Sequence, residues 1–382
     1  MVLNDLINKS IFLMGAGATT EAGCLTSKGM LSNLEEKITQ EDDKLSREAY
    51  YYLCACLEYQ NSWRNLKIKN NDYSSNIEDY IFLLRKIINR DHYLPYPLIG
   101  NWSEKIIKLE SKDDDIFKKI LNKIENIYLK EWLSINQTKQ NALLNPLRNF
   151  LQCTSSDGFL LNIFTINYDL VFETYFNNEY ETLINDGFSS GKWNDNFDLS
   201  VSKEQNKYRI NYYKLHGSLN WERNREDPEL GQIVKTLDNV SSSKQIIIFG
   251  QEAKMLSIDP FLTLTSRFRT KLEQSSYYFI IGYSFFDTYI NNLVLESVNK
   301  FPEKKLIIVN SSPKSTKEIS EKIYRIQEAD ISGNMYNIKK INPNKINYIQ
   351  STASEFYSKF FSNSGKELTN LFENLSKPDE PF

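Results

Sequence analysis

Seven short runs of mostly apolar residues set the strongest limit on the fold of this chain. They are rich in β-branched and aromatic residues, and they cover residues 10–14, 159–166, 208–215, 245–250, 277–283, 305–310 and 346–350. Strands that are buried on both faces of a sheet read as continuous apolar runs of this kind. Residues 287–300 show helical periodicity between two of these runs. Strands separated by helices predict a doubly wound, Rossmann-like α/β fold with a mostly parallel sheet.

A long helical segment interrupts the predicted strands. Asn76 is a residue type that caps helices, and a stripe of apolar residues follows it. Residues 116–128 carry a second stripe at helical spacing. We therefore predict one α/β domain formed by residues 1–35 and 151–360, an inserted helical module at 36–150, and a terminal helix and tail at 361–382.

Composition excludes several classes of protein. The chain has 382 residues, 41% of them hydrophobic, and a formal net charge of -3. It can bury a large core and lacks the basic excess of a nucleic-acid-binding protein. Because it has neither an apolar run of roughly 18 residues nor a secretion signal at its start, we expect a cytoplasmic protein that does not span a membrane. The four cysteines, Cys24, Cys54, Cys56 and Cys153, lack zinc-ribbon spacing, so we expect buried thiols and no zinc.

The first apolar run leads into a glycine loop. Gly15, Gly17 and Gly23 give a strand, a loop and a helix entry, where backbone amides can bind a pyrophosphate. The third glycine of the ordinary dinucleotide fingerprint would fall at Thr20, so that fingerprint is broken. The loop is therefore either a phosphate site or a tight turn without a ligand. The candidate binding residues in it are Gly15, Ala16, Gly17 and Thr19.

Two later strand ends carry polar residues. Asn167 and Asp169 follow the run at 159–166, and His216 follows the run at 208–215. Ligand groups collect at the carboxyl ends of parallel strands, although Asn and Asp are also common turn formers. A lone histidine is often a packing residue, but its unperturbed pKa near neutrality suits a general base. The only other histidine, His92, has no such setting, and we interpret it as a surface or hinge residue.

In this order along the chain, the glycine loop, Thr165-Ile166-Asn167-Tyr168-Asp169 and His216-Gly217 resemble the NAD-binding domain of the sirtuin family. The resemblance covers residues 10–31 and 159–312, and it implies a sirtuin-type fold with NAD+ as substrate. It implies that Asn167 orients the nicotinamide ribose or the attacking water. Asp169 would then hold the nicotinamide carboxamide, and His216 would act on a ribose hydroxyl or assist the nucleophile.

The resemblance extends to loops after later strands. Gly282 and Ser284 are similar to the family's Gly-Thr-Ser loop, which contacts phosphate and the adenine ribose. Asn310 is similar to a strand-end Asn at the adenine ribose, and Phe249-Gly250 to a Phe-Gly pair of the family. Asp287 resembles an acidic residue of the bacterial sirtuin-like branch and is assigned to cofactor binding; a helix N-cap is its plain alternative.

Two departures from the family pattern narrow the function. Protein deacylases of the family carry a four-cysteine zinc module and an Ile-Pro-x-Phe-Arg segment, whereas this chain has four scattered cysteines and Cys24-Leu25-Thr26-Ser27-Lys28-Gly29. The combination resembles the sirtuin-like NAD+ hydrolases of bacterial anti-phage defence. We therefore expect hydrolysis of NAD+ to nicotinamide and ADP-ribose, with Asn167 and His216 as catalytic residues. The alternatives are an NAD-dependent protein deacylase and a non-catalytic scaffold that binds NAD or ADP-ribose.

The same resemblance implies partners. Such hydrolases act in assemblies, and this chain has no obvious sensor domain. We expect a homo-oligomer and a HerA-type DNA translocase or ATPase as partner, with a short Argonaute as the alternative partner.

Overall fold

Seven strands form one parallel sheet at the centre of the molecule. The computed structural model describes residues 3–67, 74–89, 102–154, 158–177, 183–198, 208–223, 233–236, 245–247, 259–312, 317–321, 323 and 341–376. The strand order is β12-β11-β10-β1-β2-β6-β3, and every neighbouring pair is parallel. The strands are β1 (Ser10–Met14), β2 (Leu161–Thr165), β3 (Ile184–Asn185), β6 (Ile210–Lys214), β10 (Tyr277–Ile281), β11 (Lys305–Asn310) and β12 (Ile346–Gln350). The predicted doubly wound, mostly parallel fold is confirmed.

Alternate residues of each strand enter two different cores, as the pleat of a strand requires. Phe12 stacks on Phe279 at 4.8 Å on one face, while Phe164 stacks on Tyr213 at 4.2 Å on the other. The second face is covered by α10 (Phe261–Gln274) and α11 (Thr288–Lys300). The first face is covered by α1 (Leu3–Asn8), α8 (Gln137–Cys153), α9 (Val171–Phe176), α13 (Ala353–Phe360) and α14 (Lys366–Ser376). Burial on both faces explains why the strands read as continuous apolar runs.

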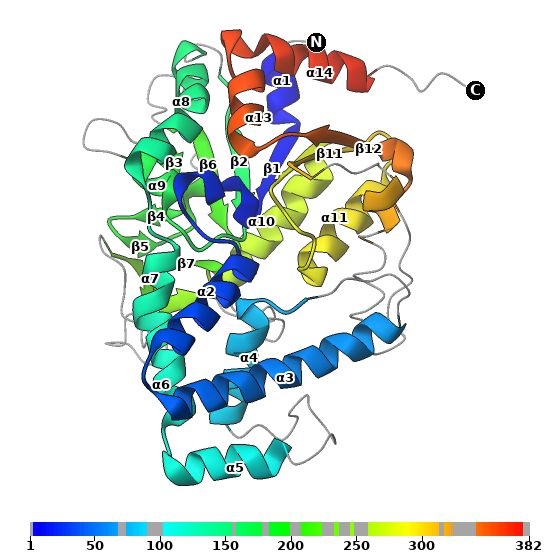
Figure 1. Cartoon of the computed structure of the whole chain (residues 1–382). Helices are drawn as coiled ribbons and strands as arrows, with labels where there is room; N and C mark the ends of the chain where they lie inside the picture. Colours follow the sequence, from blue (N-terminus) through cyan, green and yellow to red (C-terminus); the bar gives the residue numbers. More distant parts are fainter. Residues whose placement is uncertain are drawn as a thin grey trace.

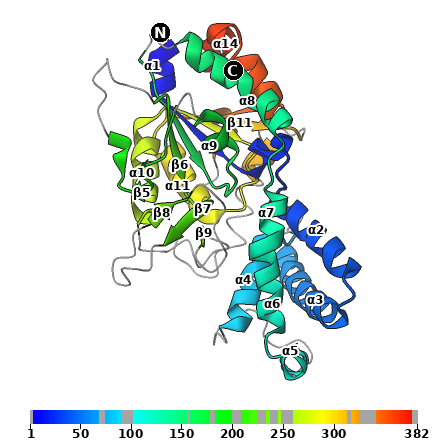
Figure 2. The same cartoon turned by 90° about the vertical axis from the view of Figure 1, so that its left-hand side faces the viewer.

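The helical module lies below the sheet in Figures 1 and 2. Its members are α2 (Ser27–Gln40), α3 (Lys44–Lys67), α4 (Ile77–Ile88), α5 (Trp102–Lys112), α6 (Ile116–Lys123), a π-helical segment η3 (Ile124–Tyr128) and α7 (Leu129–Trp132). Asn76 caps α4 as predicted, in a capping box with Asp79. The domain boundaries stay a prediction, but α8, which falls inside the predicted module, lies with the sheet and not with these helices. Its Gln140 donates to the carbonyl of Val171 at 2.7 Å, and its Phe150 contacts Phe361.

A second sheet is antiparallel, and its strand β7 begins directly after His216. Its order is β4-β5-β8-β7-β9, with β4 (Phe188–Ser189), β5 (Lys192–Trp193), β7 (Gly217–Arg223), β8 (Ile233–Lys235) and β9 (Gln245–Ile247). Trp193, Phe188 and Trp221 pack together on it. The strand predicted at 245–250 therefore exists in part, as β9, but it pairs antiparallel with β7 and does not belong to the parallel sheet.

The C-terminal helices close the first core. The Tyr357 hydroxyl of α13 contacts the sulfur of Met14 at 3.8 Å, and the backbone amide of Ser354 donates to Glu21, just after the glycine loop. Within the terminal helix and tail predicted at 361–382, α14 is the helix, and residues 377–382 lie outside the described residues. Short helical turns complete the described chain: η1 (Ala16–Ala18), η2 (Thr20–Ala22), η4 (Asn196–Asp198), η6 (Pro343–Lys345) and η7 (Asn363–Gly365). Among the described helices, none has the length and apolar character of a bilayer span.

Candidate active site

The glycine loop after β1 packs backbone to backbone against the loop after β10. Gly15 donates its amide to Ile281 at 3.0 Å, and Gly17 donates to the carbonyl of Gly282 at 2.9 Å. Gly282 has a φ of +60°, and a Cβ added there would lie 2.3 Å from the amide nitrogen of Ala18. No other residue fits at Gly282 without moving the glycine loop. The predicted helix entry differs from the structure, because the two 3-10 turns η1 and η2 follow the loop and α2 begins only at Ser27.

Asn167 is buried against this loop, with 6% of its surface exposed. Its Nδ2 donates to the carbonyl of Gly15 at 3.0 Å and lies 3.2 Å from the Thr19 hydroxyl. Thr19 in turn donates to Oδ2 of Asp169 at 2.8 Å, and Oδ1 of Asp169 accepts the amide of Val171 at 3.0 Å. Thr19, Asn167 and Asp169 therefore form one connected polar network. In this network the side-chain amide of Asn167 uses both of its N–H donors. Its carbonyl oxygen remains as an acceptor for a hydroxyl or a water.

A buried ion pair lies beside the loop that carries Asn167 and Asp169. Lys214 is 1% exposed; its ammonium donates to the backbone carbonyl of Asp169 and to Oε1 of Glu173, the latter at 2.7 Å. Burial raises the pKa of the Glu173 carboxyl, and the Lys214 charge opposes that shift. Sequence reasoning missed both residues. The signal for Lys214 was its place as the one charged residue of β6, two positions before His216.

His216 is held by a carboxylate and an aromatic ring. Its Nε2 lies 2.9 Å from Oδ2 of Asp287, and both side chains are buried. Oδ1 of Asp287 accepts the amide of Ile290 at 3.0 Å, so the same residue caps α11. The Tyr168 ring stacks on the imidazole, with 6.4 Å between ring centroids and 26° between planes. Tyr168 follows Asn167 directly, and it therefore joins the two predicted catalytic loops.

Tyr168 also connects the site to the helical module. Its hydroxyl donates to Oε1 of Glu78 in the first turn of α4 at 3.0 Å, and the Ser27 hydroxyl lies 3.5 Å from the same oxygen at the start of α2. Burial and the nearby Glu78 carboxylate raise the pKa of the Tyr168 hydroxyl, so it remains a donor. Two helices of the module thus begin at the loop that carries Asn167.

The remaining predicted site residues lie at the same edge of the sheet. The amide of Gly282 donates to the carbonyl of Val309 at 3.1 Å, which joins the loops after β10 and β11. Ser284 is exposed in the first of these loops. Asn310 is half-buried in the second, where its side-chain oxygen accepts the amide of Ser312 at 3.1 Å. Among the described contacts, neither residue joins the network of Asn167. Phe249-Gly250 and His92 lie outside the described residues.

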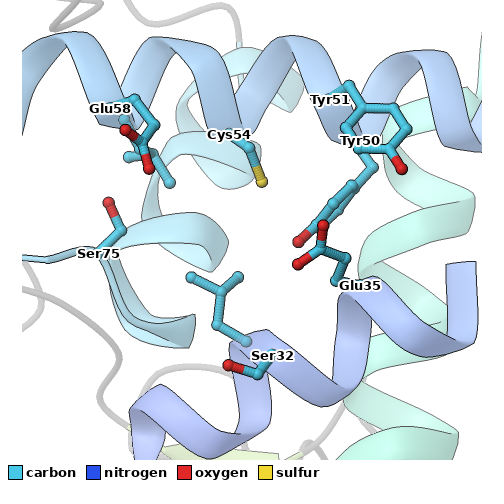
Figure 3. Close-up of a pocket in the computed structure, with 9 residues that line it drawn as sticks. Ser32, Glu35, Tyr50, Tyr51, Cys54, Glu58 and Ser75 are labelled. Carbon is cyan, nitrogen blue, oxygen red and sulfur yellow. The ribbon is translucent and has the colours of Figure 1, made fainter. Parts of the chain in front are cut away.

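A cleft of about 210 Å³ lies in the helical module, apart from these loops (Figure 3). It is formed mainly by α2 and α3, and Tyr50, Tyr51, Cys54 and the carboxylates Glu35 and Glu58 line it. Burial raises the pKa of the Cys54 thiol to about 11, so the thiol stays protonated at neutral pH and is a poor nucleophile. Across the described part of the chain, no three His, Cys, Asp or Glu side chains are grouped as metal ligands would be.

Comparison with known proteins finds one family similarity. The family model described as “SIR2-like domain” matches residues 161–331. This segment of the chain is similar to that family. It carries the loops after β2, β6, β10 and β11, and with them Asn167, His216 and Asp287. The glycine loop lies outside the matched segment but is joined to it through the pairing of β1 with β2 and β10. None of the curated proteins matches the chain.

Solved structures of Sir2 homologues are also similar to this chain. A mutant Sir2 homologue in complex with 2'-O-acetyl ADP ribose is 12% identical, with a TM-score of 0.43 over 96% of this chain and 93% of that chain. A second mutant homologue with ADP ribose is 12% identical, with a TM-score of 0.41 over 99% and 98%. A Sir2 homolog–NAD complex is 12% identical, with a TM-score of 0.40 over 96% and 90%. At these scores, we base the fold on the strand order and the domain match alone.

Proposed function

We propose that this protein hydrolyses the N-glycosidic bond of NAD+ and releases nicotinamide and ADP-ribose. The observation that carries the proposal is the placement of Asn167 and His216. One is fixed on the glycine loop and the other on Asp287, and Tyr168 lies against His216. An amide acceptor and a buried imidazole at the carboxyl edge of a doubly wound sheet suit a reaction on a nucleotide sugar.

The reaction requires the protein mainly to position the substrate and a water molecule. The pyridinium of NAD+ is already cationic, so it leaves as neutral nicotinamide without a general acid. The protein must hold the ribose and place a water molecule. In this proposal Asn167 binds that water or the ribose, His216 accepts its proton, and Asp169 binds the nicotinamide carboxamide. Gly15, Ala16, Gly17, Thr19, Gly282 and Ser284 bind the phosphate end, and Asn310 binds the adenosine end.

The test is direct. The purified full chain, with its partner where one is required, is incubated with NAD+, and nicotinamide and ADP-ribose are separated and quantified. We expect Asn167→Ala and His216→Ala to lower the rate of nicotinamide release by at least about 100-fold, the size expected for loss of water positioning or general-base catalysis. Nicotinamide release at the wild-type rate by either variant would contradict the assignment.

Protein deacylation is the second candidate reaction, and the placement of the cysteines favours hydrolysis over it. Cys24 follows the glycine loop, Cys54 and Cys56 lie on α3, and Cys153 ends α8, so the four thiols sit on three separate parts of the fold. Strand β7 of the antiparallel sheet follows His216 directly. Turnover of an acyl-lysine peptide that is faster than NAD+ hydrolysis would favour the deacylase. Tight NAD+ binding without turnover in the presence of all partners would favour a scaffold.

We further propose that the reaction depletes NAD+ during anti-phage defence and that assembly restrains it. A homo-oligomer and a HerA-type ATPase are the proposed assembly, with a short Argonaute as the alternative partner. The Glu78–Tyr168 contact supports restraint through the module, because it joins α4 to the loop of Asn167. The identity of the neighbouring gene tests the proposed partner. The proposed role is tested by measuring cellular NAD+ after phage infection in cells that carry the wild type or His216→Ala.

A further inference from the structure

We propose that Asp287 fixes the tautomer of His216, so that Nδ1 is the ring nitrogen that accepts the proton in the reaction. This inference rests on the proposed NAD+ hydrolysis and names the basic atom within it. It makes Asp287 a positioning residue, in addition to the capping role that its place before α11 suggests. The argument has three parts: the carboxylate contact, the rigidity of that carboxylate and the environment of Nδ1.

The contact determines where the ring proton lies. Nε2 of His216 is 2.9 Å from Oδ2 of Asp287, an ion-pair distance that is not in hydrogen-bond geometry, and the two side chains are 6% and 4% exposed. At this distance an ionised carboxylate repels a bare nitrogen lone pair, so the nitrogen nearest to it carries the hydrogen. A neutral imidazole has one N–H and one acceptor nitrogen. With the hydrogen on Nε2, the lone pair of the neutral ring is on Nδ1.

Asp287 cannot easily turn away from this contact. Its other oxygen, Oδ1, accepts the amide of Ile290 at 3.0 Å in the first turn of α11. Tyr283 donates its hydroxyl to the backbone carbonyl of Asp287 at 3.1 Å and lies 2.8 Å from Oδ1 of Asn291, whose Nδ2 donates to the carbonyl of Phe285 at 2.5 Å. The loop between β10 and α11 is therefore braced on both sides of Asp287, and the carboxylate is pre-organised for the imidazole.

The other nitrogen is buried and free. Among the residues that the structure describes, none forms a hydrogen bond with Nδ1 of His216. The parallel ring of Tyr168 lies against the imidazole, so the ring keeps its orientation. A buried polar atom without a partner costs stability, and nearly all buried polar atoms in folded proteins are paired. A water or ribose hydroxyl that enters and donates a hydrogen bond to Nδ1 removes this cost. Its proton then points at the nitrogen that accepts it in the reaction.

The histidine content of the chain allows a direct test. The chain has two histidines, His92 and His216, so ¹⁵N-histidine labelling of the full-length His92→Gln protein leaves one imidazole to observe. At neutral pH we expect the Nε2–H tautomer, with Nδ1 at the chemical shift of an unprotonated nitrogen. In Asp287→Asn, the amide donates to Nε2 and the hydrogen moves to Nδ1, so the two signals exchange their types. Because Asn caps helices as well as Asp, α11 is retained.

Kinetics give the second readout. We expect Asp287→Asn to lower kcat by at least about 100-fold, since the wrong tautomer of a catalytic histidine removes its basic nitrogen from the reaction, while KM changes less than about threefold. The matched control is Asn136→Asp, the reverse exchange at the cap of α8, where Asn136 accepts the amide of Lys139 at 3.1 Å on the surface. We expect the control to change neither the spectrum nor kcat.

The outcomes separate this inference from the proposed function. An Nδ1–H tautomer in the wild-type spectrum, or wild-type kcat in Asp287→Asn, would overturn the inference even if NAD+ is hydrolysed. Absence of hydrolysis with every partner present would overturn the proposed function, while the spectrum still reports whether Asp287 sets the tautomer. If Asp287→Asn does not fold, Asp287→Ser keeps a cap without an acceptor for Nε2–H. A mixture of tautomers in it supports the inference, and an unchanged Nε2–H form contradicts it.

Discussion

At the scale of single residues, the loop that carries Asn167 depends on a buried charge. Lys214 neutralises Glu173 and binds the backbone of Asp169. Removing one partner of a buried ion pair leaves the other charge in a site of low polarity, which costs far more than the pair itself contributes. The same loop carries Asp169, so loss of the ion pair should also disturb the predicted nicotinamide site.

Lys214→Met should therefore destabilise the protein by roughly 3–5 kcal/mol at pH 7. Burial raises the pKa of Glu173, so the folded state binds this proton more readily than the unfolded state, and the stability of the variant falls as pH rises through the raised pKa. Urea unfolding at pH 7 and at pH 5 measures the effect, which should be smaller at pH 5. The double variant Lys214→Met with Glu173→Leu is the control. It should recover much of the loss, and equal loss in both variants would contradict the ion-pair explanation.

The sequence predicts the reactive residues of the site better than their partners. Asn167, Asp169 and His216 stand just after recognisable strands, where ligand groups collect; they follow β2 and β6 in the structure, and their roles stay a prediction. The contact of His216 with Asp287 joins two loops that are distant along the chain, and no local pattern encodes it. Glu173 is a polar residue in a short helix, and only the tertiary structure shows that Lys214 lies against it.

At the scale of elements, the candidate site depends on the close approach of the loops after β1 and β10. Gly17 and Gly282 are in backbone contact. The ladder from Ser10–Tyr277 to Met14–Ile281 sets this approach, because the two strands end together.

Gly282→Ala should separate these loops. A positive φ alone costs a non-glycine residue roughly 1–3 kcal/mol, and here the new Cβ would also lie 2.3 Å from the amide nitrogen of Ala18. Gly158→Ala is a matched control, since Gly158 has a φ of +69° with nothing within 4 Å of the added Cβ. We expect both variants to lose stability in urea unfolding, Gly282→Ala more than Gly158→Ala. Only Gly282→Ala should raise KM for NAD+, and an equal KM in the two variants would show that the approach is not needed for binding.

The sequence predicts a strand well where the strand is buried on both faces, because its sequence is then a continuous apolar run. The bounds of β1, β11 and β12 are those predicted, and β2, β6 and β10 lie within the predicted runs. β3, β4 and β5 have two residues each, too few to give a pattern. β7 begins with Gly217-Ser218, which reads as part of the site and not as a strand. The direction of β9 depends on its partner β7, and periodicity carries no information about pairing.

At the scale of the whole molecule, the module and the α/β domain share one core, and the Tyr168–Glu78 hydrogen bond is one of their polar connections. The proposed hydrolysis of NAD+ would need restraint in a cell, and this contact would give the module a route to the site. We expect the isolated, dilute protein to be slow. Specific activity should rise as protein concentration or added partner drives assembly, measured as nicotinamide release alongside light scattering. Full activity in a dilute monomer would exclude restraint by assembly.

The pairing of β1 with β10 also bears on the synthesis of the protein. β1 leaves the ribosome early, while β10, which pairs along its whole length, emerges after most of the chain. Until β10 has emerged, the amides of Gly15 and Gly17 lack the backbone carbonyls that accept their hydrogen bonds. An unfinished polypeptide therefore cannot assemble the loop proposed to bind NAD+, and the proposed chemistry would begin only after translation has passed β10.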